Sequence, residues 1–586
     1  MNEVEWHPAV QDNRSVHLVL LLALAALLFF LGLGSLGLTD RDEGSNAEAA
    51  REMVETGDWV SPTLNYQPRF AKPAFIYWLM SAAYTTFGVS EFSARLPSAV
   101  AGVGLILLQY LVLARLRTPL VGLLSAVMLL LNLEIVAIGR MALTDSVLIL
   151  CTTLSLYGFW LGFNGEARAR HWIWLFYVGM GLGTLTKGPI GLAVPLLAVV
   201  PYLTLTKRWP QFWQKGVPLA GLAVCLAIAL PWYATMLALH GSRYSQSAQA
   251  DTIGRFAHTI GGHGGTLLFY VPILLFGFFP WSGLTSVALY QTWQEWRASR
   301  GSLQGRAGDL ELFAALWLVA GFVFFSLSAT RLPHYIGPLF PAAAILAACY
   351  WNRCLSEPAP PGLRAAIHLT MGLGFLLGLG FSSAPALYDR FIDVIGKEFP
   401  MASQASPGFG PVAVGLTLVL GCALIGVFGF SDDRRAGTFW AAGAMIAIVI
   451  LLAIQVILPR FNAAFIAPPQ ELAYAAGVNL GPDDRLILYG PARPSLIFYA
   501  KRPVLVIRPG EEDQLHPLVS GTGRTLILLP SRLKPKLPPE AAGFVTILQS
   551  SGYSLLASDS ILKLPANLPP PPVYDPAKDP HARYKQ

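Results

Sequence analysis

Charged residues are scarce in this sequence. Only 13% of its 586 residues are Asp, Glu, Lys or Arg, whereas soluble domains carry about a quarter. Uncharged apolar runs of roughly 20 residues recur between short charged loops, which excludes an ordinary soluble domain and indicates a polytopic α-helical membrane protein. The runs are apolar on all faces, so they do not fit the alternating strands of a membrane β-barrel.

Cysteine is also rare, and its spacing does not indicate a metal site. The five cysteines show no metal-ligand spacing, and four of them lie in apolar runs, which predicts small core residues. The net charge of +7 is dispersed over short loops, as expected of a membrane protein with basic cytoplasmic loops. We therefore expect membrane lipids, and not nucleic acid, as partners.

The apolar runs predict about thirteen transmembrane helices. The first run, Leu18 to Leu38, is too long for a signal peptide and has no A-x-A cleavage site, so we expect an uncleaved helix. The expected spans are 17–38, 95–113, 118–138, 143–163, 172–186, 188–205, 217–238, 266–288, 311–328, 332–350, 365–382, 409–430 and 437–458.

Basic residues fall in alternate loops between these spans, for example at Arg115, Lys207 and Arg434. Because cytoplasmic loops are enriched in Lys and Arg, this pattern predicts a cytoplasmic N-terminus. An odd number of spans then places everything after about residue 459 outside the cytoplasm. The outer loop 39–94 follows the first helix directly.

Several charges are anomalous in this topology, because basic residues are normally scarce on the outer side. They are Arg140, Lys187, Arg255 and Arg331. One interpretation is that each side chain reaches from a helix end to the lipid headgroups. The other is a cationic pocket for phosphate, which the nearby acids Asp42, Glu43 and Asp145 favour.

The C-terminal part of the chain has a different composition. We predict two domains, a transmembrane domain over 1–458 and a small α/β domain over 459–586. Short buried strands are expected at 485–489, 504–507 and 525–529, with short helices at 494–500 and 511–519. This region has no Gly-rich phosphate loop and no nucleophile elbow, and from residue 568 onward it is Pro-rich, so we expect a supporting or acceptor-facing role.

Seven segments of the first 350 residues resemble one family. They are DRDEGSNAEAAREMVETGDW, RFAKPAFIYW, SARLPSAVAG, GRMALTDSVL, GLGTLTKGP, LFYVPILLFGFFPW and SLSATRLPHYIGPLFP. Together they are similar to the aminoarabinose transferase family, a member of the membrane glycosyltransferases related to protein O-mannosyltransferases (the GT-C fold).

This resemblance implies transfer of a sugar from a polyprenyl phosphate carrier, such as undecaprenyl phosphate, to a lipid, glycan or protein acceptor. The reaction would occur on the periplasmic face of a bacterial inner membrane. Asp42 matches the family's catalytic aspartate, and Asp145 is a further catalytic candidate. The residues expected at the donor phosphate or substrate are Glu43, Lys72, Lys187, Arg255, Arg331 and Tyr335.

The acidic residues have alternative roles. Asp42 is either the base for a hydroxyl acceptor, an orienting group for a phosphate acceptor, or an N-cap of the following helix. Thr144 or Asp145 could equally cap the fourth helix. Glu43 could serve structure, a metal or a sugar, and the sequence does not decide among these.

The sequence also departs from the family pattern. Ala71 stands where many relatives have Glu before Lys-Pro, and Asp251-Thr252 precedes Arg255-Phe256 where relatives tend to show Glu-His. We therefore predict no metal site of that kind, although a divalent cation held by His240, His258 or His263 stays open. The departures also leave the identity of the sugar open.

Two other functions fit a membrane protein of this size. A transporter of lipid-linked sugars would need ionisable residues at the membrane midplane and usually repeated halves, and the sequence shows no internal repeat. A catalytically inactive scaffold is opposed by the retained Asp42, Lys72, Arg255 and Tyr335.

Overall fold

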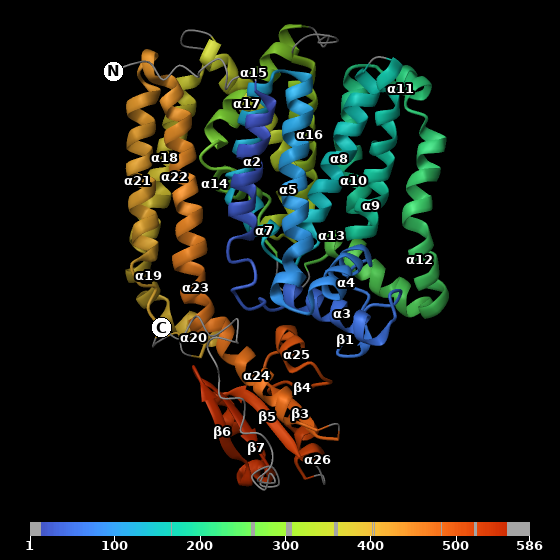
Figure 1. Cartoon of the computed structure of the whole chain (residues 1–586), viewed down its shortest axis with the longest axis vertical. Helices are drawn as coiled ribbons and strands as arrows, with labels where there is room; N and C mark the ends of the chain where they lie inside the picture. The colour runs from blue at the N-terminus through green and yellow to red at the C-terminus, as the bar shows by residue number, and fades with distance from the viewer. Residues whose placement is uncertain are drawn as a thin grey trace.

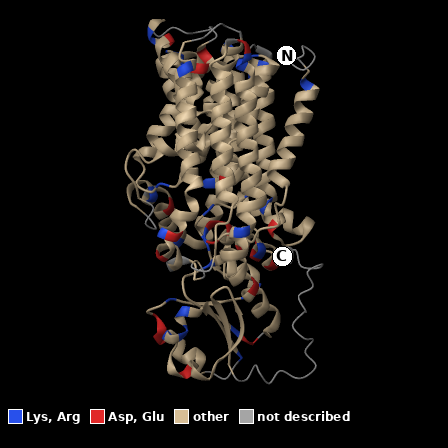
Figure 2. Cartoon of the chain, turned by 90° about the vertical axis from the view of Figure 1, so that its left-hand side faces the viewer, with Lys and Arg blue, Asp and Glu red and all other residues tan. Residues whose placement is uncertain are grey.

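A computed structural model describes residues 13–165, 167–259, 264–299, 308–356, 361–400, 402, 405–481, 483–520 and 524–558. Upright helices form a bundle, and a small sheet domain lies beyond one end of it (Figure 1). Lys, Arg, Asp and Glu gather near the two ends of the bundle and in the sheet domain, whereas the middle of the bundle is nearly free of them (Figure 2). His263 and the Pro-rich tail lie outside the described residues.

Within the described ranges, seven helices are long and apolar enough to cross a membrane, or nine if each of two bent helix pairs forms one span. The seven are α5 (Glu91–Leu116), α8 (Asp145–Asn164), α12 with its extension (Pro218–Ala257), α16 (Gly308–Leu327), α18 (Leu363–Ser382), α21 (Gly410–Gly429) and the path Arg435–Asn479. The bent pairs are α6 (Pro119–Leu130) with α7 (Leu133–Gly139) and α14 (Tyr270–Gly277) with α15 (Ser282–Ala298). A polytopic protein is thus confirmed, and the count of thirteen spans stays a prediction.

Other helices are shorter. They are α2 (Arg14–Phe30), α3 (Asp42–Thr56), α4 (Phe75–Phe87), α9 (Ile173–Lys187), α10 (Ile190–Leu205), α11 (Trp209–Lys215), α13 (Arg255–Ala257), α17 (Phe340–Ser356), α19 (Ala384–Arg390) and α20 (Ile392–Glu398). A two-residue hairpin, β1 (Thr63–Leu64) and β2 (Gln67–Pro68), lies between α3 and α4. A 3₁₀ segment, η3 (Pro333–Leu339), precedes α17 and replaces the start of the span expected at 332–350.

The first helix is shorter than the sequence predicted. It ends at Phe30 and not at Leu38, and Gly32 follows it with φ +63°. The apolar run continues through LGLGSLGL, whose glycines lower helix propensity, so hydropathy alone overestimates the helix. The irregular stretch of turns that results leads directly to α3.

Two predicted spans are bent by identifiable residues. The axes of α6 and α7 differ by 68°, and Asn132 lies in the break between them. Its Oδ1 accepts a hydrogen bond from the Ile135 amide at 2.8 Å, so Asn132 caps α7. Pro280 lies in the 113° break between α14 and α15. Gly241, with φ +53°, kinks α12, whose second part turns across the end of the bundle (Figure 1).

Helices α8 and α9 pack closely through glycines. A Cβ at Gly158 would lie 2.7 Å from the Cβ of Leu175, and one at Gly179 would lie 2.6 Å from the Cys151 carbonyl oxygen. Small residues let membrane helices approach in this way, where packing replaces the hydrophobic effect as the driving force. The contact fixes the start of α8, at Asp145, beside the end of α9, at Lys187.

The C-terminal region folds into a five-stranded sheet of order β4-β3-β5-β7-β6. Strands β3 (Arg485–Tyr489), β4 (Leu505–Ile507) and β5 (Thr525–Pro530) are parallel, and β6 (Val545–Ser550) and β7 (Tyr553–Ala557) add an antiparallel hairpin. Helices α25 (Pro494–Ala500) and α26 (Leu515–Val519) connect the parallel strands, and the sequence had not predicted the hairpin.

The sheet is attached through one long helical path. It runs through α22 (Arg435–Leu452), a π-helical turn (Ala453–Ile457), α23 (Leu458–Phe461), a second π-helical turn (Asn462–Ile466) and α24 (Ala467–Asn479). The predicted domain boundary at residue 459 falls inside this path, so helix continues well past it. The boundary itself stays a prediction.

Candidate active site

Asp42 is the first residue of α3, at the end of the bundle nearest the sheet domain (Figure 1). Arg41 precedes it with φ +68°, and no side chain caps this helix start. The alternative that Asp42 serves as the N-cap is therefore wrong. Its half-buried carboxylate lines a cavity and has no hydrogen-bond or ion-pair partner in the described part of the chain.

The cavity is small, and it is lined by side chains from distant parts of the sequence. Five predicted site residues line it: Asp42, Lys72, Asp145, Lys187 and Tyr335. The remaining lining residues are Asn46, Leu143, Thr144 and His334. Glu43, Arg255 and Arg331 are not among the lining residues.

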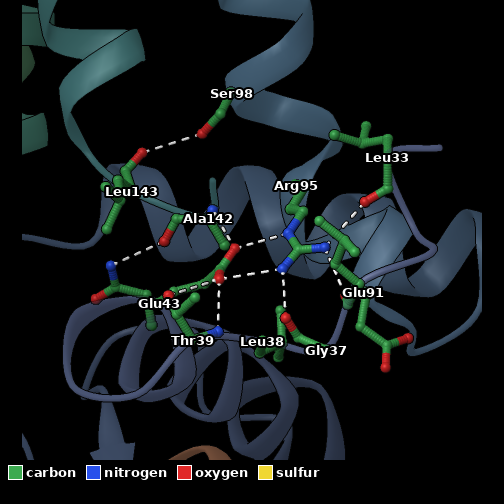
Figure 3. Close-up of polar contacts among 12 residues, drawn as sticks. Leu33, Gly37, Leu38, Thr39, Glu43, Glu91, Arg95, Ser98, Ala142 and Leu143 are labelled. Carbon is green, nitrogen blue, oxygen red and sulfur yellow. Dashed lines mark hydrogen bonds and ion pairs between the residues drawn. The ribbon is translucent and has the colours of Figure 1, made fainter. Parts of the chain in front are cut away.

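Glu43 is a structural residue of this region, although it was predicted to bind substrate. Its carboxylate is 1% exposed and forms an ion pair with Arg95 at 2.7 Å (Figure 3). It also accepts hydrogen bonds from the amide and hydroxyl of Thr39, at 2.7 and 2.9 Å, and from the Ala142 amide at 2.9 Å. Burial would raise the pKa of Glu43, but Arg95 and these hydrogen bonds outweigh it and keep the pKa below its ordinary value.

Arg95 completes this anchor. Besides Glu43, its guanidinium donates to the carbonyl oxygens of Leu33, Leu36 and Gly37 at 3.0, 2.7 and 2.9 Å. These carbonyls belong to the irregular stretch between α2 and α3. The anchor therefore joins that stretch, α3 and the turn before α8 immediately beside Asp42.

Lys187 and Asp145 form an ion pair across α8 and α9. The Lys187 Nζ lies 2.6 Å from Asp145 Oδ1 and 4.7 Å from the ring centroid of Tyr335. Neither Thr144 nor Asp145 caps α8 through its side chain. Asp145, predicted as catalytic, thus holds a cation at the cavity.

Lys72 is the second cation that lines the cavity. Its ammonium has no hydrogen-bond or ion-pair partner among the described residues. Burial lowers the pKa of Lys72 to about 8, and Lys187 and Arg255 add to this effect, whereas Asp42 and Asp145 oppose it. The unpaired ammonium is available to bind an anion in its protonated form.

The two predicted arginines differ in position. Arg255 is paired with Asp251, with Nη2 2.8 Å from Oδ1, and its Nη1 donates to the Tyr335 hydroxyl at 3.5 Å, so it adjoins the cavity. Arg331 is 8% exposed and donates to the carbonyl oxygens of Ser326, at 2.9 Å, and Gly265. The structure therefore gives Arg331 a role in fixing the backbone, and not a place in the cavity.

His334 and Asn46 were missed in the sequence. His334 stands between Pro333 and Tyr335, in a motif that identifies the tyrosine as a site residue but not the histidine. Asn46 lies one helical turn after Asp42. An i, i+4 pattern from Asp42 could have identified Asn46. Burial, partly opposed by Asp145 and Asp42, lowers the pKa of His334, which favours the neutral imidazole.

The residues present do not fit a metal site of the family's kind. Asp251 is engaged by Arg255, and Ala71 offers no ligand atom. His240 Nε2 lies 2.9 Å from the Ser61 hydroxyl, and His258 is exposed. No group of three His, Cys, Asp or Glu side chains in the described ranges could hold an ion.

The sheet domain binds the segment that leads to Asp42. Ser495 donates to Asp40 from its hydroxyl and, at 3.3 Å, from its amide, and Arg493 lies 3.5 Å from the same carboxylate. The Tyr499 hydroxyl donates to Glu91 at 2.7 Å and accepts from the Leu38 amide at 3.0 Å. The C-terminal region thus supports the site without lining the cavity.

Comparisons with known proteins identify the relatives of this chain. Residues 16–243 match the family model described as dolichyl-phosphate-mannose-protein mannosyltransferase. The chain is 30% identical over 463 residues to the undecaprenyl phosphate-α-4-amino-4-deoxy-L-arabinose arabinosyl transferase of Edwardsiella ictaluri, covering 78% of this chain and 79% of that protein. It is 29% identical to the protein of the same name from Enterobacter sp., covering 85% and 86%.

The fold has a solved counterpart. The crystal structure of ArnT from Cupriavidus metallidurans bound to undecaprenyl phosphate superposes with a TM-score of 0.74 at 22% identity, over 93% of this chain and 99% of that one. None of these findings supports the transporter alternative. The chain is a multi-pass membrane glycosyltransferase and belongs to the undecaprenyl phosphate-aminoarabinose arabinosyl transferase family, with the GT-C fold.

Proposed function

We propose that this protein transfers a sugar from a polyprenyl phosphate carrier, of the undecaprenyl phosphate type named for its relatives, to an envelope lipid, glycan or protein. One observation carries the proposal. An unpaired carboxylate, Asp42, and the cations Lys72 and Lys187 line one cavity at an end of the bundle. A phosphate leaving group and an attacking acceptor need such a combination.

In this reaction the bond between the sugar's anomeric carbon and the phosphate oxygen breaks, and its electron pair stays on the phosphate. Lys72 and Lys187, with Arg255 and Tyr335 beside them, stabilise the charge that develops there. A new bond forms between the anomeric carbon and the acceptor oxygen. A hydroxyl acceptor gives its proton to Asp42, whereas a phosphate acceptor needs no base and is oriented by Asp42.

The proposal includes an orientation. The cavity lies on the outer, periplasmic side of a bacterial inner membrane, the N-terminus is cytoplasmic, and the domain after about residue 459 is periplasmic. Alternating basic loops support this orientation. The thirteen spans and the two-domain division at 458/459 belong to the same proposal.

Purified protein in lipid nanodiscs, given labelled sugar on undecaprenyl phosphate and an envelope extract, tests the proposal. We expect Asp42→Asn to lower kcat by about 10²- to 10⁴-fold for a hydroxyl acceptor, with undecaprenyl phosphate binding retained. Asp58→Asn is the matched control, because Asp58 is an exposed residue of the same loop. Its Oδ1 accepts hydrogen bonds from two backbone amides, and the side-chain oxygen of an asparagine can accept the same bonds. Full transfer by Asp42→Asn would remove this carboxylate from the chemistry.

A further inference from the structure

Apart from Thr144, whose hydroxyl donates to Asp145 at 3.3 Å, two uncharged polar side chains line the cavity beside the catalytic candidates without a part in the transfer chemistry described above. They are Asn46 on α3 and His334 on η3. Asn46 lies four residues after Asp42, so both side chains emerge from the same face of α3. His334 directly precedes Tyr335, whose ring contacts Lys187.

The orientation of Asn46 is fixed by a carbonyl. Its Nδ2 donates to the Ala142 carbonyl oxygen at 3.1 Å, and a carbonyl can only accept, so the amide nitrogen must face Ala142. The other end of the amide, Oδ1, therefore points away from Ala142. Asn46 is 1% exposed, and Oδ1 is buried without a hydrogen-bond donor among the described residues.

The frame that holds Asn46 is rigid. The Ala142 amide donates to Glu43 Oε1 at 2.9 Å, so Glu43 and Asn46, on adjacent turns of α3, bind both polar backbone groups of one residue. Glu43 is itself fixed by Arg95 (Figure 3). A buried acceptor held in this way cannot turn toward another partner without breaking its bond to Ala142, so a ligand that donates to Oδ1 would remove the cost of leaving it unpaired.

His334 supplies complementary groups. Neither of its ring nitrogens has a partner in the described part of the chain, and its ring meets that of Tyr335 edge-on with centroids 5.1 Å apart. The charged groups that face it are Asp145, Lys187, Asp42 and Lys72. A neutral imidazole offers one donor and one acceptor, which matches a sugar hydroxyl.

We propose that Asn46 and His334 form the subsite that recognises the transferred sugar, with Asn46 Oδ1 accepting a hydrogen bond from a hydroxyl or amino substituent. The inference rests on the proposed function, because it places the sugar beside the phosphate-binding cations. It separates two tasks within one cavity: Lys72 and Lys187 bind the carrier phosphate, and the uncharged pair selects the sugar.

The test compares two kinds of ligand in nanodiscs: undecaprenyl phosphate without a sugar, and undecaprenyl phosphate bearing either arabinose or 4-amino-4-deoxyarabinose. We expect Asn46→Leu and His334→Leu to weaken binding of the sugar-bearing ligands by about tenfold or more, because a buried partner is lost. Binding of undecaprenyl phosphate alone should stay within about twofold of the wild type, which also shows that the variant is folded. His334→Gln, which keeps a donor and an acceptor, should recover part of the loss.

The outcomes separate the two proposals. If the wild type binds neither ligand, the proposed function fails. If it binds both, and the variants weaken both equally or neither, the subsite is overturned and Asn46 serves only to hold Ala142. A loss confined to the KM of the acceptor also overturns it. The ratio of wild-type affinities for the two sugars identifies whether a hydroxyl or an amino group meets Asn46.

Discussion

Replacing Arg95 with alanine should destabilise the protein more than any surface ion-pair change. The Arg95 and Glu43 side chains are 5% and 0% exposed, so the substitution leaves a buried carboxylate without its counter-charge. Removing one partner of a buried ion pair costs about 3–5 kcal/mol. The carbonyls of Leu33, Leu36 and Gly37 also lose their donor, which places the expected loss at the upper end of that range.

Unfolding in detergent can be followed with a thiol-reactive dye, because all five cysteines are buried in the folded chain. Arg353→Ala is the matched control. Its partner is Glu295, and the two side chains are 35% and 44% exposed, so we expect a loss of about 0–1 kcal/mol. The double variant Glu43→Gln/Arg95→Met should be less destabilised than Arg95→Ala, since it removes both charges together.

The transfer rate provides a second measurement. Because Glu43 directly follows Asp42 and fixes the start of α3, Arg95→Ala should lower kcat even at temperatures where the protein stays folded. If Arg95→Ala is no less stable than Arg353→Ala, the anchor does not stabilise the fold and our account of Glu43 is wrong.

Three further predictions concern the site and its orientation. The pKa of Lys72 is about 8, so its positive charge is present below that pH and lost above it, and kcat/KM for the donor should fall as pH rises through about 8. Lys72→Arg should move this fall in kcat/KM to higher pH. A fall at the same pH in the variant would contradict the assignment. Ser495→Ala removes a hydrogen bond to Asp40, so it should lower kcat several-fold while donor affinity is kept. Ser495→Thr, which keeps the hydroxyl, should restore kcat. Equal kcat in all three proteins would show that the sheet domain does not position the segment that leads to Asp42. In spheroplasts, an impermeant thiol reagent should label the Arg508→Cys variant, because Arg508 is exposed on the sheet domain. The same reagent should not label the Trp213→Cys variant, because Trp213 lies at the opposite end of the bundle. Labelling of Trp213→Cys alone would mean that the proposed orientation is inverted.

The helices of the bundle could be predicted because long apolar runs have few alternatives in a chain so poor in charge. The strands at 485–489 and 525–530 were predictable for a similar reason, as short buried runs between turn residues. The end of the first helix was not, because Gly32 and the following glycines change backbone preference without lowering hydropathy much. The hairpin β6–β7 was missed because its first strand is only partly buried and carries no continuous apolar run.

The candidate site shows where sequence patterns stop. Asp42, Lys72 and Tyr335 were identified from motifs, and all three line the cavity. The role of Glu43 could not be assigned, because Arg95 lies 52 residues away and only the fold brings them together. Arg331 was predicted as a phosphate ligand, but its guanidinium donates to backbone carbonyl oxygens. Every residue has such a carbonyl, so no sequence pattern indicates which one an arginine will bind.

The helical path into the sheet domain has a consequence for the evolution of this protein. The Gly37 amide donates to Asn462 Oδ1 at 2.8 Å, and Gln470 Nε2 donates to the Leu38 carbonyl at 2.6 Å. Substitutions in the stretch before α3 are therefore constrained by residues more than 400 positions later. Chimaeras that exchange only the C-terminal third between relatives should lose activity, and those that exchange residues 31–44 together with it should keep it, because these contacts then stay matched.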